Sequence, residues 1–339
     1  MSRRPTALPP GAEARIGLVG DVMLGRNVDD RWSGGDPAGV WGSTLDRVRS
    51  LDGLLCNLEC AVSARGERRS GRAYYFRADP DWAVPALEAA GVRFASLANN
   101  HLLDFGPTAL VDTTDHLAAA GIAHAGAGPD RAAAVRPAVA SVGDLSVGVV
   151  AFTDQSASYR AGPDSPGTAW TPLSHRAAGT RRLVADALAT VHERDPDLVV
   201  ASLHWGPNWV VEPSRGQRAF ARWLVDNGVD VGHGHSAHVV QGVETYRGRP
   251  IVYDAGDFVD DYVLKPDLHN DRSFLFDLVV ADGRLARLDL HPVEIVDERV
   301  ERASEEAAAW LRERMRALSG PFGTTVERSG RGLSVPLAE

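Results

Sequence analysis

The stretch Gly20-Asp21-Val22-Met23-Leu24-Gly25-Arg26 follows a β-rich run at residues 15–19, which places Asp21 at the carboxyl end of a predicted strand. Four later segments also end an apolar run on a metal-binding or proton-carrying side chain: Asn57-Leu58-Glu59, Asn99-Asn100-His101-Leu102-Leu103-Asp104, His204-Trp205-Gly206 and His233-Gly234-His235-Ser236-Ala237-His238. Strands that stop at such side chains bring ligands from distant parts of the sequence to one edge of an α/β sheet. The pattern predicts a metalloenzyme.

Each of these segments has an ordinary structural interpretation when it is taken alone. An Asp after a strand often caps a helix, and a buried His is usually a hydrogen-bonded core residue. Together, however, the segments supply the carboxylates, amides and imidazoles that divalent ions bind. This convergence of ligand-type residues favours a metal site over the structural interpretation.

The composition is that of a globular protein. Of the 339 residues 44% are hydrophobic, which is ordinary for one large α/β domain or two small ones. The 36 basic and 45 acidic residues leave a net charge of −9, which disfavours a broad nucleic-acid-binding surface but allows a local pocket for an anion. We therefore expect a small anionic substrate and no nucleic-acid partner.

The apolar runs and the cysteines indicate a cellular compartment. No apolar stretch is long enough for a signal peptide or a membrane helix, so we expect a cytoplasmic protein with no membrane partner. Cys56 and Cys60 flank Glu59 and are expected to be small buried thiols beside a strand end. A disulfide or a zinc pair is not expected, because cytosolic thiols stay reduced and the sequence holds no second cysteine pair.

Strand and helix signals alternate before residue 235, and antiparallel strand patterns follow it. The expected helices are 81–90, 107–120, 179–194, 214–227 and 300–318, and the expected strands include 15–19, 53–56, 92–98, 198–203, 238–243, 250–253, 273–280 and 287–292. We expect a hairpin at 139–153, a long loop at 155–174 and an irregular tail after the last helix. This order predicts one α/β domain in which two mixed sheets pack face to face with helices outside.

Several motifs resemble those of the calcineurin-like metallophosphoesterases, and most closely those of the CapA-type poly-γ-glutamate capsule-synthesis branch. Besides the five segments above, the resemblance rests on residues 75–80, 234–244 and 253–258, and it covers roughly residues 15–295. It implies a four-layer αββα sandwich with a divalent-metal site where the strands end. The expected organisation is a disordered tail at 1–14, this domain at 15–295, and a C-terminal helix and tail at 296–339 packed on the domain.

The same resemblance implies roles for individual residues. His101 would be the proton donor, oriented by Asp104. Water activated by a divalent ion is a usable nucleophile near neutral pH, and an imidazole beside a carboxylate can protonate the leaving oxygen. The implied cofactors are divalent metal ions (Mn, Fe or Zn), and the implied ligands are Asp21, Asn100, His204, His235 and His238, with Glu59 at the metal-bridging position.

Met23 departs from the common metallophosphoesterase pattern, in which a His stands two residues after the first Asp. The capsule branch shares this departure, so Met23 supports the closer resemblance. A thioether is a weak ligand for Mn, Mg or Fe, which leaves one half of a two-metal site short of ligands unless His233 or water fills it. We therefore expect one tightly held ion and a second, labile one.

Three further residues are candidates for substrate binding: Arg26, Arg77 and Trp205. Each arginine either clamps a phosphate or carboxylate or pairs with a structural Asp. Trp205 either forms an apolar wall of the site or packs its loop.

The leading hypothesis is a metal-dependent hydrolase of this type, which acts on a phosphoester or on a γ-glutamyl or related amide with His101 as proton donor. The alternative is a non-hydrolytic metal-binding partner in poly-γ-glutamate or peptide-bond-forming biosynthesis. A metal-stabilised structural module is less favoured, because a structural site would not need the pair His101 and Asp104.

Overall fold

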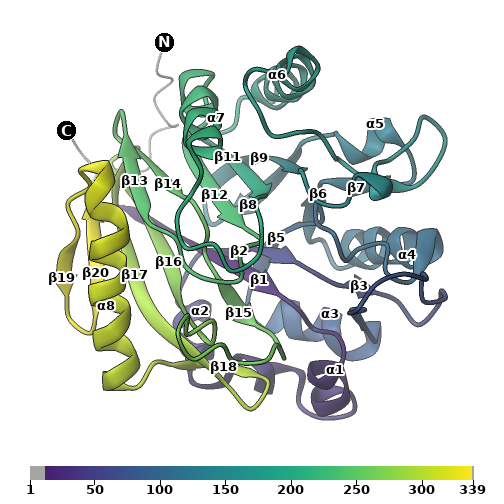
Figure 1. Ribbon diagram of the computed structural model, residues 1–339, viewed down its shortest axis with the longest axis horizontal. Coiled ribbons are helices and arrows are strands. Elements are labelled where there is room, and N and C mark those ends of the chain that lie inside the picture. Colours follow the sequence, from purple (N-terminus) through teal and green to yellow (C-terminus); the bar gives the residue numbers. More distant parts are fainter. Residues whose placement is uncertain (1–11, 338–339) are drawn as a thin grey trace.

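Two mixed β-sheets form the centre of the computed structural model, which describes residues 12–337 (Figure 1). The larger sheet has ten strands, in the order β19 (Glu327–Ser329), β20 (Gly332–Pro336), β17 (Arg284–Val296), β16 (Arg272–Ala281), β1 (Glu13–Val22), β2 (Gly53–Leu58), β5 (Val92–Ser96) and β6 (Ala123–Ala125), with β15 (Asp257–Val259) paired to β1 and β18 (Arg299–Arg302) paired to β17. The smaller sheet has six, in the order β13 (Val243–Tyr246), β14 (Arg249–Val252), β12 (Val231–His235), β11 (Leu198–His204), β9 (Leu145–Thr153) and β8 (Ala138–Val142).

Helices and short strand pairs occupy the connections between these strands. The helices are α1 (Asn27–Trp32), α2 (Leu45–Arg49), α3 (Pro80–Ala89), α4 (Gly106–Ala119), α5 (Arg131–Ala134), α6 (Ala178–His192), α7 (Arg215–Asp226) and α8 (Glu305–Ser319), with 3₁₀ turns η1 (Pro37–Thr44), η2 (Ala157–Tyr159) and η3 (Gly320–Phe322). The two short sheets pair β3 (Ala61–Val62) with β4 (Arg77–Ala78), and β7 (Ala127–Gly128) with β10 (Gly167–Thr168).

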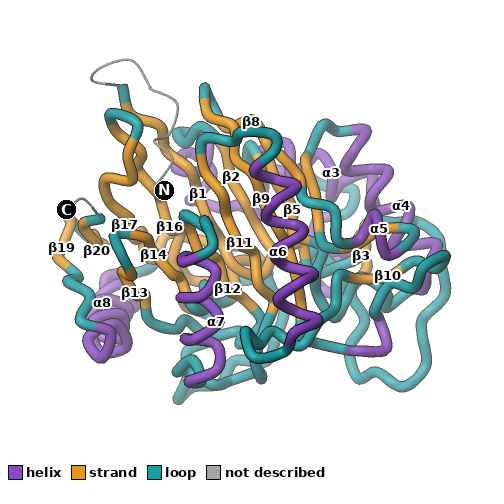
Figure 2. The backbone as a smooth tube through the Cα atoms, turned by 90° about the horizontal axis from the view of Figure 1, so that it is seen from above, coloured by secondary structure: helices purple, strands orange, loops and turns teal. Residues whose placement is uncertain are grey.

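The molecule has four layers, and the predicted αββα sandwich is confirmed. Ile16 and Leu18 of the larger sheet share an apolar core with Val147 and Val200 of the smaller one. A second core joins the outer face of the larger sheet to helices that include α3 and α4, and a third joins the smaller sheet to α6 and α7. Figure 2 shows α6 and α7 lying along the smaller sheet. All seven residues of β11 are buried, as is typical of a central parallel strand covered on both faces.

The sequence-based elements agree with the structure through most of the βα part of the chain, and the strands expected at 250–253, 273–280 and 287–292 are present as β14, β16 and β17. The segment expected as a strand at 238–243 is mostly a loop, because His238 takes a left-handed backbone conformation with φ 56° and β13 begins only at Val243. The expected hairpin at 139–153 is present as β8 and β9, which pair antiparallel. The expected loop at 155–174 contains η2 and β10.

The C-terminal helix begins later than predicted. Residues 299–302 form β18, which pairs antiparallel with β17, and α8 starts at Glu305 after Ser304, whose side chain accepts a hydrogen bond from the Ala307 backbone N–H. The tail is not irregular as predicted, since β19 and β20 form a hairpin that extends the larger sheet beside β17. At residues 300–302 pairing with β17 outweighs the local helix propensity, and this pairing is available only in the folded sheet.

The predicted domain limits can be compared with these elements. The limit at residue 295 falls one residue before the end of β17, and the chain beyond it contributes both strands and core residues. The predicted tail at 1–14 lies mostly outside the described residues, and β1 begins at Glu13. Among the described residues, no helix is long and apolar enough to cross a membrane.

We predict that α8 is an integral part of the core. Leu311 is fully buried and belongs to the apolar cluster between the sheets. Leu311→Ala should lower the free energy of unfolding by about 2–5 kcal/mol, because it removes buried methyl groups and leaves a cavity. Exposed Glu313 on the same helix provides the control, and Glu313→Ala should change stability by less than about 0.5 kcal/mol in denaturant unfolding. Equal stability of the two variants would contradict this role of α8.

Candidate metal centre

Strand register brings the predicted metal ligands together. In the larger sheet Asp21 at the end of β1 stands opposite Asn57 of the parallel strand β2, and in the smaller sheet His204 stands opposite His235 across β11 and β12. The two strand ends meet across the sandwich, where His233 Nε2 lies 2.9 Å from the Val19 carbonyl oxygen. The carboxyl ends of parallel strands from two sheets therefore converge on one point, as the sequence pattern predicted.

Close backbone packing at Gly20 supports this convergence. A Cβ atom on Gly20 would lie 1.7 Å from the carbonyl oxygen of Gly256, which is closer than any side chain tolerates. The absence of a side chain lets the turn before β15 lie against β1, and the Asp21 backbone N–H donates to that Gly256 oxygen at 3.0 Å. Asp21 is thus fixed from two sides by backbone pairing.

Two groups of side chains could each hold a metal ion. One group consists of Asp21, His204 and His235, and the other of Asp21, Glu59 and His238, with the ligand atoms of each group within 4.8 Å of one another. All five side chains are buried. Asp21 is common to both groups, whereas Glu59, which was expected to bridge two ions, belongs to one.

The Asp21 carboxylate has an unused oxygen. Asn57 Nδ2 donates to Asp21 Oδ1 at 2.7 Å and to Glu59 Oε2 at 3.1 Å. Asp21 Oδ2 is buried and accepts no hydrogen bond from the described residues, although His238 Nδ1 lies 3.2 Å away. Because that nitrogen lies closer to Asp257 Oδ1, at 2.8 Å, Asp21 Oδ2 has a shared ion-pair partner and no hydrogen bond of its own, and a bound cation would lower the cost of burying it.

The ring nitrogens of His204 and His235 face each other. Their Nδ1 atoms are 2.9 Å apart, and the Nε2 atom of His235 is held by the Ser202 hydroxyl group at 2.9 Å. His204 Nε2 lies 2.7 Å from the Asn100 side chain, whose amide nitrogen fits best when it faces His204 and Glu59. Such outer partners fix the orientation of metal-binding imidazoles.

Burial and mutual charge shift the protonation of the cluster. Burial lowers the pKa of His204 to about 3 and lowers the pKa of His235 well below its usual value, so both imidazoles are neutral and able to bind metal at neutral pH. Burial, and after it the charge of Asp21, raises the pKa of Glu59 well above its usual range. Burial opposes the ionised form of Asp21, but the neighbouring His238 and then the other imidazoles hold its pKa below the usual value.

His238 differs from the other imidazoles because it faces two carboxylates. Burial acts to lower its pKa, but Asp257 at 2.8 Å and Asp21 outweigh burial and hold the pKa well above its usual value. The same burial raises the pKa of Asp257. The rings of Trp209 and Tyr262 pack beside His238, with centroids 5.4 and 4.9 Å away.

His101 and Asp104 form a pair beside this cluster. His101 Nδ1 lies 2.6 Å from Asp104 Oδ2, and His101 Nε2 lies 3.3 Å from the Asn100 side-chain oxygen in the favoured amide orientation and 3.8 Å from Glu59. Asp104 is itself held by the Phe76 backbone N–H at 3.0 Å, by Tyr159 at 3.3 Å and by Arg72 at 3.1 Å. Burial lowers the pKa of His101, while Asp104 opposes that shift. The geometry is that of an imidazole positioned by a carboxylate with one nitrogen turned toward the metal ligands.

The three predicted substrate-binding residues have other partners in the structure. Arg26 pairs with Asp261 at 3.2 Å, and Arg77 donates to the carbonyl oxygens of Arg65 and Gly66 at 3.2 Å. Trp205 is 1% exposed, donates its indole N–H to the Tyr253 carbonyl oxygen at 2.9 Å and belongs to the core beneath α7. The prediction that Trp205 forms a wall of the site does not agree with this burial, since its ring packs the loop instead.

Arg72 is at the site and was missed from the sequence. Its Nε atom pairs with Asp104, another nitrogen lies 3.2 Å from the Asn100 side-chain oxygen in the favoured amide orientation, and a third donates to the Ser156 hydroxyl group at 3.3 Å. The Arg72 side chain as a whole is 20% exposed. Arg72 stands in the basic run 65–72, which contains no recognisable motif. The sequence alone therefore does not distinguish Arg72 from the other arginines of this run.

Comparison with known proteins identifies relatives along most of the chain. The family model described as bacterial capsule synthesis protein PGA_cap matches residues 15–262. A probable polyglutamine synthesis accessory protein of Mycobacterium tuberculosis is 38% identical over 91% of this chain and 92% of its own length. The capsule biosynthesis protein CapA of Bacillus anthracis is 28% identical over 82% of this chain and 66% of its own.

A solved structure supports the fold. The crystal structure of a hypothetical protein from Thermus thermophilus aligns with a TM-score of 0.50 and 17% identity, and the match covers 83% of this chain and 100% of the other. At this identity the likeness concerns the arrangement of sheets and helices alone.

We predict that Asp21→Ala, His204→Ala and His235→Ala each lose bound metal while staying folded, because these side chains supply the ligand atoms of the first group. Metal content is measured by mass spectrometry and folding by circular dichroism. His233→Ala is the matched control, since His233 lies in the same strand as His235 but faces the Val19 carbonyl group. Full metal content in all three variants would eliminate this site.

Proposed function

The chain belongs to the bacterial capsule synthesis protein family PGA_cap, and from this premise we propose that it is a divalent-metal-dependent hydrolase of CapA type. The proposed substrate is a small anionic phosphoester or a γ-glutamyl or related amide. The observation that carries the proposal is the pair His101 and Asp104 beside two groups of metal-ligand side chains. A structural metal site has no use for an imidazole that is oriented by a carboxylate and faces the ligands.

The residues present fit a divalent ion. Carboxylate oxygens and imidazole nitrogens, among them those of the neutral His204 and His235, lie around Asp21, whose Oδ2 atom accepts no hydrogen bond from the described residues. Asp21, His204 and His235 would hold one ion, and Glu59 and His238 would complete a second position with Asp21. When bound, such an ion would polarise a substrate oxygen and lower the pKa of a coordinated water molecule toward neutrality.

Proton donation and substrate binding are assigned to residues beside the metal ligands. The imidazolium form of His101 would donate its Nε2 proton to the leaving oxygen or nitrogen, while its Nδ1–H stays bonded to Asp104, which fixes the ring. Arg72 would bind the negative charge of the substrate, since its guanidinium group lies next to Asn100 and its side chain is partly exposed. Burial of the carboxylates places these charges in a medium of low dielectric constant, which strengthens their interactions.

A second candidate function is a non-hydrolytic partner in poly-γ-glutamate or peptide-bond-forming biosynthesis. Its support is the word accessory in the name of the Mycobacterium tuberculosis relative. Met23 supports it as well, because this residue is fully buried in the apolar core beneath α3 and α4 and adds no strong ligand to the second metal position. In this role the site would bind a carboxylate or acyl-phosphate group without hydrolysing it.

Turnover by the purified, metal-loaded protein separates the two functions. The test substrates are p-nitrophenyl phosphate, bis-p-nitrophenyl phosphate and γ-glutamyl-p-nitroanilide. A hydrolase releases the nitro-aromatic product from at least one of them in a metal-dependent manner, whereas the accessory role gives binding without release.

We predict that His101→Asn keeps its metal and lowers turnover by roughly two to four orders of magnitude, the range for loss of a general acid. The loss should shrink for a substrate with an activated leaving group, which needs less protonation. His124→Asn is the control, because His124 is half-buried in β6, where its ring faces the Ile122 carbonyl group at 3.3 Å. If His101→Asn instead loses metal, His101 is a ligand and its assigned role is wrong.

We further predict that Arg72→Ala raises KM for anionic substrates by about tenfold or more, since a charge-assisted contact would be lost. The KM of Arg72→Lys should fall between those of the unmodified protein and Arg72→Ala, because the ammonium group keeps the charge but lacks the planar geometry. Arg69→Ala is the matched control, since Arg69 stacks on the same Tyr159 ring in the same loop but is exposed. Equal KM values for Arg72→Ala and Arg69→Ala would remove Arg72 from substrate binding.

A further inference from the structure

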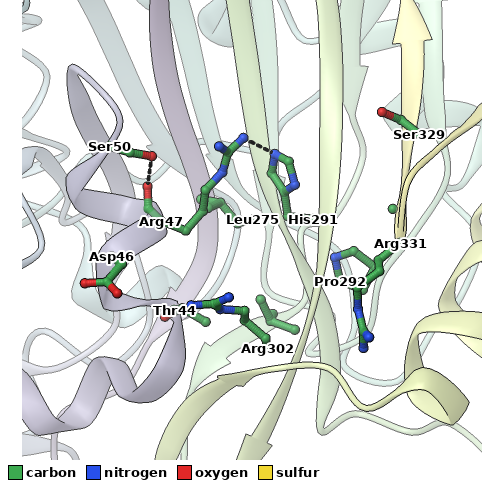
Figure 3. A pocket seen from close by; sticks show the side chains of 12 residues that line it. Thr44, Asp46, Arg47, Ser50, Leu275, His291, Pro292, Arg302, Ser329 and Arg331 are labelled. Atoms are coloured by element: carbon green, nitrogen blue, oxygen red, sulfur yellow. Dashed lines mark hydrogen bonds between the residues drawn. The ribbon is translucent and has the colours of Figure 1, made fainter.

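A cavity of about 440 Å³ lies beside α2, separate from the metal-ligand cluster (Figure 3). Its wall is built from α2, from β16 and β17 at the centre of the larger sheet, from β18, and from the β19–β20 hairpin. None of the predicted metal ligands lines it. Its volume is in the range of small-molecule binding pockets.

The lining combines an apolar floor with a basic rim. Leu275, Pro292 and Val293 provide the apolar surface, and Leu275 and Val293 are buried core residues. The guanidinium groups of Arg47, Arg302 and Arg331 come from three different elements around the opening, as Figure 3 shows. Among the lining residues Asp46 is the one carboxylate, and its side chain is exposed.

Backbone oxygens fix two of these arginines. Arg302 donates its Nε–H to the Ser43 carbonyl oxygen at 2.7 Å. Its two terminal nitrogens do not take part in this hydrogen bond. Arg331 donates to the Ala303 carbonyl oxygen at 2.7 Å, and its nearest carboxylate is Glu305 at 3.4 Å, which is 61% exposed. An arginine held at one edge binds an anion with less loss of side-chain entropy than a free one.

The third arginine shares its carboxylate partner. Arg47 lies 2.6 Å from Asp277 Oδ2, and Arg15 lies 2.5 Å from the same oxygen. One buried carboxylate therefore contacts two guanidinium groups, and Arg15 also approaches Asp289 at 3.8 Å. The Nε atom of Arg47 is buried and has no hydrogen-bond partner among the described residues. His291 Nε2 lies 2.6 Å from Arg47 and extends the polar side of the cavity.

We propose that this cavity binds a small organic anion, with its carboxylate or phosphate group between Arg47, Arg302 and Arg331 and its apolar body on Leu275 and Val293. Three guanidinium groups and one carboxylate line the cavity, which favours an anionic ligand, and the apolar floor favours a hydrocarbon body over an inorganic ion. The site is independent of the metal centre and of the hydrolase proposed above.

Calorimetric titration of the full chain tests this site with three probes: 3-phenylpropionate, phenyl phosphate and the neutral 3-phenylpropanamide. At least one anion should bind, and the amide should bind about tenfold or more weakly, because it has the same ring but no charge. The anion that binds more tightly identifies the preferred head group. No binding of either anion at millimolar concentration would overturn the proposal, and so would equal affinities for the anions and the amide.

Variants assign the binding to this cavity. Arg302→Gln should weaken anion binding by about tenfold, and Ser329→Glu, which places a negative charge on the rim, should weaken it as well. Arg316→Gln is the matched control, because Arg316 is also exposed and also donates its Nε–H to a backbone oxygen, that of Val326, away from the cavity. Asp21→Ala should leave affinity unchanged. A loss of binding in Asp21→Ala but not in Arg302→Gln would place the anion at the metal centre and overturn the proposal.

Discussion

The buried carboxylate of Asp21 is the constraint on which the rest of the site depends. It lies at the end of β1, fully excluded from water, with the second buried carboxylate of Glu59 sharing its Asn57 donor. Two like charges in such a place are stable only with a compensating cation or a bound proton. The pKa of Glu59 is raised accordingly, first by burial and then by the negative charge of Asp21. A divalent ion would satisfy both groups together.

The βα half of the fold could be predicted from the sequence because its signals are local. Apolar runs such as 198–203 are long enough to mark central strands, and they end at polar residues that define the sheet edge. The C-terminal part could not be predicted in the same way. β18 and β20 exist because β17 offers them an edge, and the sequence at 299–302 carries a helix-like pattern that this pairing overrides.

Some residues of the candidate site could likewise be predicted from the sequence, and others could not. Asp21, His204 and His235 follow strands directly, so their convergence could be predicted from parallel strand ends. Arg72 could not be found, because its place beside Asp104 depends on how the loop between β3 and β4 folds over the strand ends. Trp205 was misplaced for a related reason. Successive residues after a strand point in different directions, and sequence adjacency to His204 does not show which side chain faces the other metal ligands.

The central claim is that two sheets converge to form a divalent-metal site around Asp21. The most direct measurement is an anomalous difference map from a crystal grown with Mn²⁺, recorded on the high-energy side of the manganese absorption edge. We expect a strong peak in contact with Asp21, His204 and His235, and a weaker one near Glu59 and His238. The absence of a peak at Asp21, in crystals kept in a solution with millimolar Mn²⁺, would contradict a metal site around this carboxylate.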